Sequence, residues 1–203
     1  MQRNKVYFFK DKIIKVYSSK QNLKNELKFN EKFSKYFKVP EIYQINENSI
    51  EMERLENKLL KDEINKKRDF GVIKYFIEKL DYINNEDKSI AHGDLRLPHV
   101  FISKEKDFAL IDFEYSNYGD INFDLAYFYF SLLKNKFKKE SERLKDIIMK
   151  DYDYIKFLKS ANCYCENMKN NSFVRDKKIW DDNIREINND LKEFYSLNSN
   201  IFK

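Results

Sequence analysis

The chain has 203 residues, of which 42% are hydrophobic and 16% aromatic, so it has enough apolar surface for a folded core and is not expected to be disordered. Its 39 Lys and Arg residues alternate with 34 Asp and Glu residues, so the net charge of +5 predicts no specific nucleic-acid partner. No apolar run is long enough to cross a bilayer, the N-terminus has no signal-peptide core, and Cys163 and Cys165 are expected to be reduced thiols, which together predict a cytoplasmic protein.

The first forty residues predict a β-hairpin followed by an amphipathic helix. Residues 5–17 form two β-rich runs on either side of a Lys10-Asp11 turn. Residues 21–37 change to a helical period, and Val39-Pro40 is expected to end that helix because proline disfavours helical backbone in the residue before it. The positions that share one face of this helix are Leu23, Leu27, Asn30, Phe33 and Phe37.

After the proline, the predicted elements change from strands to helices. Strands are expected at residues 42–45 and 49–55, joined by a turn at residues 46–48. Residues 69–83 predict a helix, because apolar side chains recur there at helical spacing. Further helices are expected at residues 124–150, with Asp124 as the N-cap, at residues 151–168 and at residues 176–195.

This order of elements predicts a two-lobed α+β protein. Residues 1–56 would form a small β-rich lobe with one helix, and residues 57–203 a mainly helical lobe. Two short hairpin strands, Val100–Ile102 and Phe108–Ile111, are expected inside the second lobe. A cleft between two lobes is a common place for a ligand.

Residues 90–130 concentrate the side chains that can carry chemistry. Asp94 follows Gly93 on a turn, where a carboxylate can orient or accept a proton from a substrate hydroxyl. Arg96 adds a positive charge two residues later. Asp112 ends an apolar strand and Glu114 follows it, and such oxygen ligands suit Mg²⁺. These are the parts that phosphoryl transfer requires.

The ordered motifs of this stretch resemble the aminoglycoside phosphotransferase and choline kinase superfamily, a small-molecule branch of the protein-kinase-like fold. The resemblance rests on His92–Leu95 (His-Gly-Asp-Leu), Ile111–Glu114 (Ile-Asp-Phe-Glu), Gly119-Asp120 and Asp124–Ala126 (Asp-Leu-Ala). Its central motif is most similar to that of choline and ethanolamine kinases. It implies a protein-kinase-like fold with a reduced N-terminal β lobe, and it ends near residue 134.

The resemblance extends more weakly upstream and implies an ATP site. Lys15 matches the lysine that binds nucleotide phosphate, and Glu26 matches its ion-pair partner. Met52 and Glu53 fall in a segment similar to the strand that enters the interlobe hinge, whose backbone would meet adenine.

In the central stretch, the same resemblance makes Asp94 the catalytic aspartate, with Arg96 beside it. Asp112 becomes the main Mg²⁺ ligand, which Glu114 could join, and Asp124 becomes a structural brace for the catalytic loop.

Two departures from the family pattern bear on activity. His99 stands where the family usually has a metal-binding asparagine, so it is a candidate metal ligand, although imidazole suits softer ions better than Mg²⁺ and His99 could instead be a core histidine. The chain also begins at what matches the second strand of the family, and its first glycine is Gly71, so no glycine-rich loop is expected over the phosphates.

Structural alternatives accompany several of these residues. Asp94 and Asp112 could be turn and cap residues, and Arg96 could form a local salt bridge. His92 fits a buried support of the loop better than a base, and Glu114 could brace a loop. The aromatic residues of the C-terminal helices could form core or include a cage for a quaternary ammonium ion.

The sequence therefore predicts an ATP-dependent phosphotransferase that acts on a hydroxyl of a small molecule, such as an amino alcohol, an aminoglycoside or a sugar. One alternative is a pseudokinase that serves as a binding or scaffold protein. Another is a kinase of sugars or of the lipopolysaccharide core. The acceptor and the oligomeric state are not readable from the residues.

Overall fold

The computed structural model describes residues 4–67, 69–86, 90–105, 107–170 and 177–198. The chain divides into two compact units, Met1–Ile121 and Asn122–Lys203. The lobe boundary predicted from the sequence, after residue 56, does not coincide with this division. That boundary remains a prediction.

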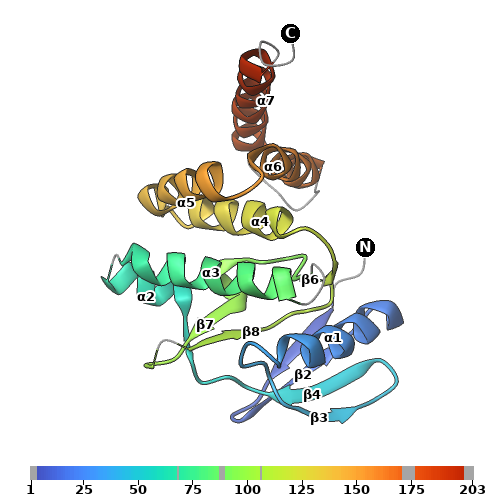
Figure 1. Ribbon diagram of the computed structural model, residues 1–203. Coiled ribbons are helices and arrows are strands. Elements are labelled where there is room, and N and C mark those ends of the chain that lie inside the picture. Colours follow the sequence, from blue (N-terminus) through green and yellow to red (C-terminus); the bar gives the residue numbers. More distant parts are fainter. Residues whose placement is uncertain (1–3, 68, 87–89, 106, 171–176, 199–203) are drawn as a thin grey trace. The chain divides into compact units, whose positions relative to one another are not determined.

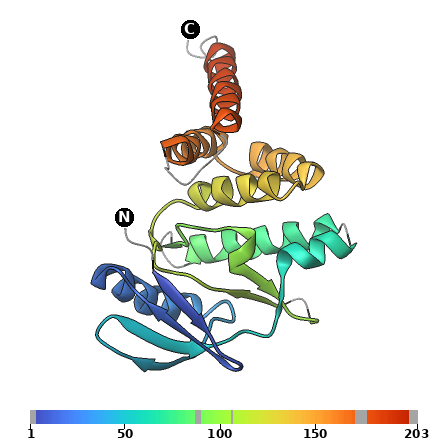
Figure 2. The same cartoon turned by 180° about the vertical axis from the view of Figure 1, so that it is seen from behind.

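The first unit combines short strands with helices (Figures 1 and 2). Its strands are β1 (Lys5–Phe8), β2 (Lys12–Val16), β3 (Ile42–Ile45), β4 (Ser49–Glu53), β5 (Lys58–Leu59), β6 (Ile90–Ala91), β7 (Val100–Ile102), β8 (Phe108–Leu110) and β9 (Asn117–Tyr118). Its helices are α1 (Lys20–Phe33), α2 (Leu60–Lys67) and α3 (Phe70–Glu86), with a 3₁₀ turn, η1 (Leu97–His99).

The N-terminal sheet places Lys15 against α1. Its strand order is β1-β2-β4-β3 with antiparallel neighbours, so the predicted hairpin around Lys10-Asp11 is present. Helix α1 covers one face of the sheet (Figure 1), where Leu23 packs with Tyr17 and Ile50 in a buried cluster. Because side chains alternate along a strand, Lys15 shares the face of Tyr17 and points toward α1.

Helix α1 is shorter than the sequence predicts. It begins after Ser19, whose side chain accepts a hydrogen bond from the backbone N–H of Gln21, and it ends at Phe33 rather than near residue 37. The chain turns early because Lys38 pairs with β8: the Lys38 N–H donates to the Phe108 carbonyl at 3.2 Å. This long-range pairing has no local signal, and it overrides the helical period.

The rest of the first unit consists of β5 to β9, α2, α3 and η1, and it contains the two loops of the candidate site. Strands β7 and β8 form the predicted hairpin, with β5 on the other side of β7, and β6 pairs with β9. Helix α3 buries the face that the sequence predicts, which consists of Val72, Phe76, Leu80 and Ile83. The loops that follow β6 and β8 are therefore anchored at both ends by strand pairing.

The second unit is helical. Its elements are α4 (Ile121–Lys134), α5 (Lys138–Asp151), α6 (Tyr154–Asn170) and α7 (Lys178–Asn198). Aromatic rings of three helices pack on one another: Phe130 stacks on Tyr164 at 5.1 Å, and Trp180 lies 5.7 Å from Tyr164. Cys163 and Cys165 are both free thiols, as predicted. None of the helices in the described ranges is long and apolar enough to span a membrane.

The expected single helix at residues 124–150 is wrong in two respects. Helix α4 begins at Ile121, so Asp124 lies in its first turn and is not the N-cap. The helix is also interrupted after Lys134, where Lys136 adopts a φ of 64° and the Phe137 N–H donates to the Leu132 carbonyl at 3.0 Å. This is a Schellman ending, and it lacks the glycine that usually marks one in a sequence.

Candidate active site

The loop between β6 and β7 is built on a buried histidine. His92 is fully buried, its Nε2 lies 3.0 Å from the Ile111 carbonyl, and its Nδ1 accepts the Asp94 backbone N–H at 3.4 Å. Burial lowers the pKa of His92 to about 3, so the ring stays neutral. His92 therefore supports the loop, as the residue pattern favours, and is poorly suited to act as a base.

Gly93 permits the turn that presents Asp94. Its φ is +79°, and a β-carbon at this position would lie 2.1 Å from the Tyr115 carbonyl oxygen. The loop after β8 thus passes directly over the loop after β6. The Ser116 hydroxyl holds the two loops together by donating to the His92 carbonyl at 2.8 Å.

Asp94 is a largely buried carboxylate with one cationic neighbour. Its Oδ2 accepts a hydrogen bond from Nη2 of Arg96 at 2.5 Å. Burial raises the pKa of Asp94 to about 7, and the Arg96 guanidinium opposes that rise. A carboxylate with such a pKa changes its charge near neutral pH, which is the range useful to a general base.

Asp112 adopts a backbone conformation that is rare for residues other than glycine. Its φ is 74°, and the segment is fixed by Phe113, which stacks on Phe33 of α1 at 5.1 Å. Phe113 also donates its backbone N–H to the Glu26 carboxylate at 3.2 Å. These contacts aim the Asp112 carboxylate at Lys15, which donates a hydrogen bond to it.

Lys15 lies among three carboxylates. Its Nζ is 2.8 Å from Glu26 and 3.3 Å from Glu114, and it also pairs with Asp112. Burial alone would lower the pKa of Lys15, but the three negative charges outweigh it and raise the pKa above its usual range. Burial tends to raise the pKa of Asp112, but Lys15 outweighs it and holds that pKa below normal. Lys15 and Asp112 are therefore both charged at neutral pH.

Two asparagines that belong to no recognisable motif, Asn4 and Asn25, donate hydrogen bonds to Glu114. Asn4 donates its side-chain amide to the Glu114 carboxylate and accepts the Ser18 backbone N–H at 2.9 Å. Asn25 donates to the Glu114 backbone carbonyl at 3.3 Å. Burial raises the pKa of Glu114. Neither asparagine is detectable from the sequence, although Asn25 directly precedes Glu26.

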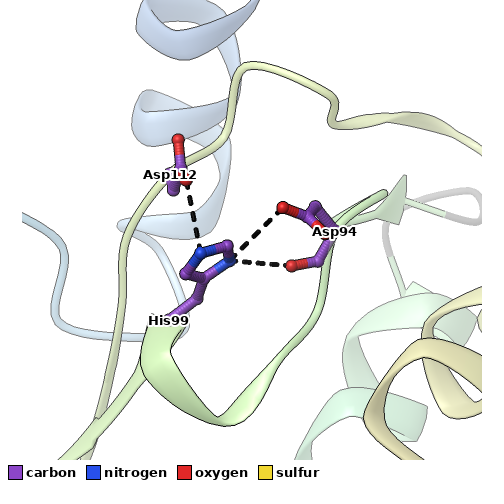
Figure 3. A group of neighbouring side chains, drawn as sticks. All are labelled: Asp94, His99 and Asp112. Carbon is purple, nitrogen blue, oxygen red and sulfur yellow. Dashed lines mark hydrogen bonds and ion pairs between the residues drawn. The ribbon is translucent and has the colours of Figure 1, made fainter. Parts of the chain in front are cut away.

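His99 connects the two halves of the site. Its Nδ1 lies 2.8 Å from the Asp94 backbone carbonyl, and its Nε2 lies 3.3 Å from Oδ2 of Asp112 (Figure 3). Nη2 of Arg96 is 3.2 Å from the same Nε2. Burial lowers the pKa of His99. The imidazole therefore bridges the loop of Asp94 to the segment of Asp112.

Among the residues that the structure describes, two groups of side chains have the donor chemistry for a divalent cation. Glu26, Asp112 and Glu114 form one group, and Asp94, His99 and Asp112 form the other; within each, one ligand atom per residue lies within 4.8 Å of the others. The first group offers only carboxylate oxygens, which fit Mg²⁺. Asp112 belongs to both groups.

The predicted hinge residues do not join this network. Met52 is buried against Tyr17, Leu23 and Ile50. The Glu53 carboxylate pairs with Lys38 at 3.0 Å, and its backbone N–H donates to the Glu41 carbonyl. Their contact with adenine remains a prediction. The other residues that the sequence nominates for catalysis, nucleotide binding or metal binding lie in one connected set of contacts within the first unit: Lys15, Glu26, Asp94, Arg96, His99, Asp112 and Glu114.

Known proteins share this fold. Monomeric WbdD superposes with a TM-score of 0.54 at 19% identity, over 78% of this chain and 44% of its own. A structure described as the bifunctional kinase-methyltransferase WbdD gives 0.51 at 18% identity, over 80% and 42%. The GDP complex of an aminoglycoside 2'-phosphotransferase-IIIa mutant gives 0.51 at 14% identity, over 97% and 89%. The chain thus spans less than half of the WbdD chains.

These similarities confirm the predicted α+β, protein-kinase-like fold. No curated protein sequence matches the chain. A model of the phosphotransferase enzyme family, APH, matches residues 37–153, which is more than half of the 203 residues and includes both central motifs. The chain therefore belongs to the APH phosphotransferase enzyme family.

Proposed function

We propose that this protein transfers the γ-phosphoryl group of ATP to a hydroxyl of a small molecule. The observation that carries the proposal is the connection of Asp94 to Asp112 through His99, with Lys15 bound to Asp112. The residues proposed as the base, the metal-binding carboxylate and the phosphate-binding cation therefore belong to one connected set of contacts. Membership of the phosphotransferase enzyme family supports the same chemistry.

Asp94 is the residue that orients the acceptor. Its carboxylate accepts a hydrogen bond from the substrate hydroxyl and takes the proton as the hydroxyl oxygen bonds to the γ-phosphorus. The bond from that phosphorus to the bridging oxygen breaks, and ADP leaves with the electron pair. The pKa of Asp94, about 7, allows the carboxylate to hold this proton briefly and then release it near neutral pH.

Lys15 and Arg96 supply positive charge to the phosphates. Lys15 is kept charged by its carboxylate neighbours and is fixed by Glu26, so it is positioned before nucleotide binds. Arg96 has a side chain that is 40% exposed, which leaves it free to turn from Asp94 toward a phosphate. Both charges would stabilise the developing charge of the transferred group.

Asp112 and Glu114 are the residues that would hold Mg²⁺. Asp112 is ionised at neutral pH because Lys15 lowers its pKa, and both residues offer oxygen donors. When bound, the ion would neutralise phosphate charge and orient the γ-phosphate for in-line attack. Asp124 as a brace for the catalytic loop, and Met52 and Glu53 as the adenine contact, complete the proposal.

The acceptor is proposed only as a class: an amino alcohol, an aminoglycoside or a sugar. The motif at residues 111–116 is similar to that of choline and ethanolamine kinases, while one structural neighbour is an aminoglycoside phosphotransferase. No membrane-spanning helix occurs in the part of the chain that the structure describes. We propose a cytoplasmic location and no specific nucleic-acid partner.

A second candidate function is that of a nucleotide-binding or scaffold protein without turnover. Both cations of the site already have carboxylate partners, because Arg96 pairs with Asp94 and Lys15 pairs with three carboxylates. Thermal unfolding with and without Mg-ATP tests for binding, since a ligand of the native state raises Tm. Stabilisation without turnover by any acceptor class would favour this second function.

The decisive experiment is ATP consumption with a panel of amino alcohols, aminoglycosides and sugars. Asp94→Asn should abolish acceptor-dependent turnover, while Asp146→Asn, an exposed position on α5, should not change it. Equal turnover in the wild type and Asp94→Asn would remove Asp94 from the mechanism.

A further inference from the structure

We propose that Tyr17 is a positioning residue for Lys15, whose ammonium group it holds in place for the nucleotide phosphates. Nζ of Lys15 lies over the face of the Tyr17 ring, 4.9 Å from the ring centroid. At such a distance an aromatic ring attracts a cation, most strongly where water is excluded. The inference rests on the proposed function, in which Lys15 binds phosphate, and it adds to that site a residue outside the sequence motifs.

The ring of Tyr17 is fixed by the strand before it and by the core around it. Tyr17 directly follows β2, and its backbone N–H donates to the Asn48 carbonyl at 2.7 Å. Tyr17 is only 4% exposed and packs with Leu23 and Ile50 in the buried cluster between the sheet and α1 (Figure 1). Because side chains alternate along a strand, the ring lies on the same face as the longer and more flexible Lys15 and can support it.

The ring, and not the hydroxyl, is the part of Tyr17 that acts on Lys15. The hydroxyl oxygen is buried and has no hydrogen-bond partner among the residues that the structure describes. Burial raises the pKa of this hydroxyl, and the Glu26 carboxylate raises it further, so the group stays neutral. An unpartnered buried hydroxyl is destabilising, and phenylalanine would fill the same space without one. Tyr17→Phe is therefore a conservative variant that keeps the proposed role.

The contact with the ring can persist while Lys15 exchanges its other partners. An ammonium group has three N–H donors, and Lys15 already has three carboxylate partners, Glu26, Asp112 and Glu114. A nucleotide phosphate therefore has to displace at least one carboxylate before it can bind this group. The ring attracts the charge of Lys15 without replacing any of these partners, so it holds the ammonium group before and after the exchange.

Tyr17 could instead only fill the core, and matched variants separate the two roles. Tyr17→Leu removes the ring and keeps an apolar side chain, whereas Tyr17→Phe keeps the ring. Leu23→Ala is the control, because it removes apolar volume from the same cluster but no aromatic ring. Tyr17→Leu and Leu23→Ala should both lower Tm, since both leave unfilled space in the core.

The first measurement is the proton NMR signal of the Lys15 ε-methylene group in the full chain without nucleotide. Protons above an aromatic face are shielded, so this signal should lie upfield of the other lysine signals, and its loss in Lys15→Met identifies it. Tyr17→Phe and Leu23→Ala should keep the upfield position, and Tyr17→Leu should lose it. An ordinary Lys15 signal in the wild type, or an upfield signal that remains in Tyr17→Leu, would overturn the inference.

The second measurement is the Kd of Mg-ADP, obtained by calorimetry. Tyr17→Leu should weaken binding about tenfold, whereas Tyr17→Phe and Leu23→Ala should stay close to the wild type. Equal affinities in Tyr17→Leu and the wild type would contradict the positioning role, because a residue that only fills the core changes Tm alone. If Tyr17→Leu does not fold, Tyr17→Met replaces it in both measurements.

The failure of this inference and the failure of the proposed function give different results. A wild type that binds no Mg-ADP would contradict the proposed function, and the Lys15 signal would still decide whether the ring holds the ammonium group. A wild type that binds Mg-ADP no better than Tyr17→Leu would contradict the role of Tyr17 and leave the proposed function standing.

Discussion

Lys15 donates a hydrogen bond to Asp112, although the two residues are 97 positions apart in the chain. Lys15 comes from β2 of the N-terminal sheet, and Asp112 comes from the loop that follows β8. Glu26 completes the connection, because its carboxylate binds both Lys15 and the backbone N–H of Phe113. The N-terminal sheet, α1 and the segment of Asp112 are thus joined by charged groups that are largely removed from water.

Replacing Lys15 by methionine should destabilise the protein. The change leaves three carboxylates near one another without their cation, and the loss of one partner of a buried ion pair costs roughly 3 kcal/mol. Millimolar Mg²⁺ should raise the Tm of Lys15→Met more than it raises the Tm of the wild type, because the ion replaces the missing charge.

The matched control is Lys20→Met, which removes a lysine from an exposed pair with Glu47 and should leave Tm unchanged. Thermal unfolding by circular dichroism measures both variants. An unchanged Tm in Lys15→Met would contradict the buried ion-pair arrangement.

Asp94 makes stability depend on pH in a defined direction. Its folded-state pKa of about 7 lies above the ordinary value of 3.8, so the folded protein binds the extra proton and stability falls as pH rises from about 4 to about 7. The slope from this group is at most about 1.4 kcal/mol per pH unit. Asp94→Asn removes the contribution of Asp94 protonation to stability. The Tm of the variant minus the Tm of the wild type should therefore increase as the pH rises over this range. A difference that is constant with pH would show that Asp94 has an ordinary pKa.

Arg96 should set the pH dependence of turnover. Its guanidinium lowers the pKa of Asp94 against the effect of burial, so Arg96→Gln should raise that pKa further. The wild-type kcat/KM should increase with pH through about 7, as Asp94 becomes the ionised base, and the increase should move to higher pH in Arg96→Gln. A profile that loses amplitude without moving would assign Arg96 to phosphate contact alone.

Gly93 should tolerate no side chain. Gly93→Ala places a β-carbon 2.1 Å from a backbone carbonyl at a positive φ, which predicts a loss of roughly 3 kcal/mol or more. Gly71→Ala is the matched control, because its β-carbon meets only the end of the Asp69 side chain at 3.0 Å and it lies in the first turn of α3. Urea unfolding compares the two. Similar midpoints would contradict the close approach of the loops after β6 and β8.

Much of the site was predictable because its signals are local. Asp94 and Asp112 are recognisable from the glycine before one and the apolar strand before the other, and both occupy these places in the structure. The pairing of Lys15 with Glu26 was implied by the family resemblance alone, and the structure contains it. For Asp94 and Asp112, the neighbouring residues carry the information.

What could not be predicted depends on contacts between distant segments. Helix α1 ends early because Lys38 pairs with β8. Asn4 contacts Glu114 although the two residues are 110 positions apart in the chain. The break after α4 uses Lys136 in a left-handed conformation, where a sequence would normally show glycine. None of these contacts leaves a periodic or compositional signal.

The most direct test of the central claim is phosphorus-31 NMR of ATP with the acceptor panel and Mg²⁺, recorded for the wild type and for Asp94→Asn. We expect the wild type to produce ADP together with the phosphate monoester of one acceptor class, and Asp94→Asn to produce neither. The same monoester formed at equal rates by both proteins, or no monoester from any acceptor with the folded wild type, would contradict the account.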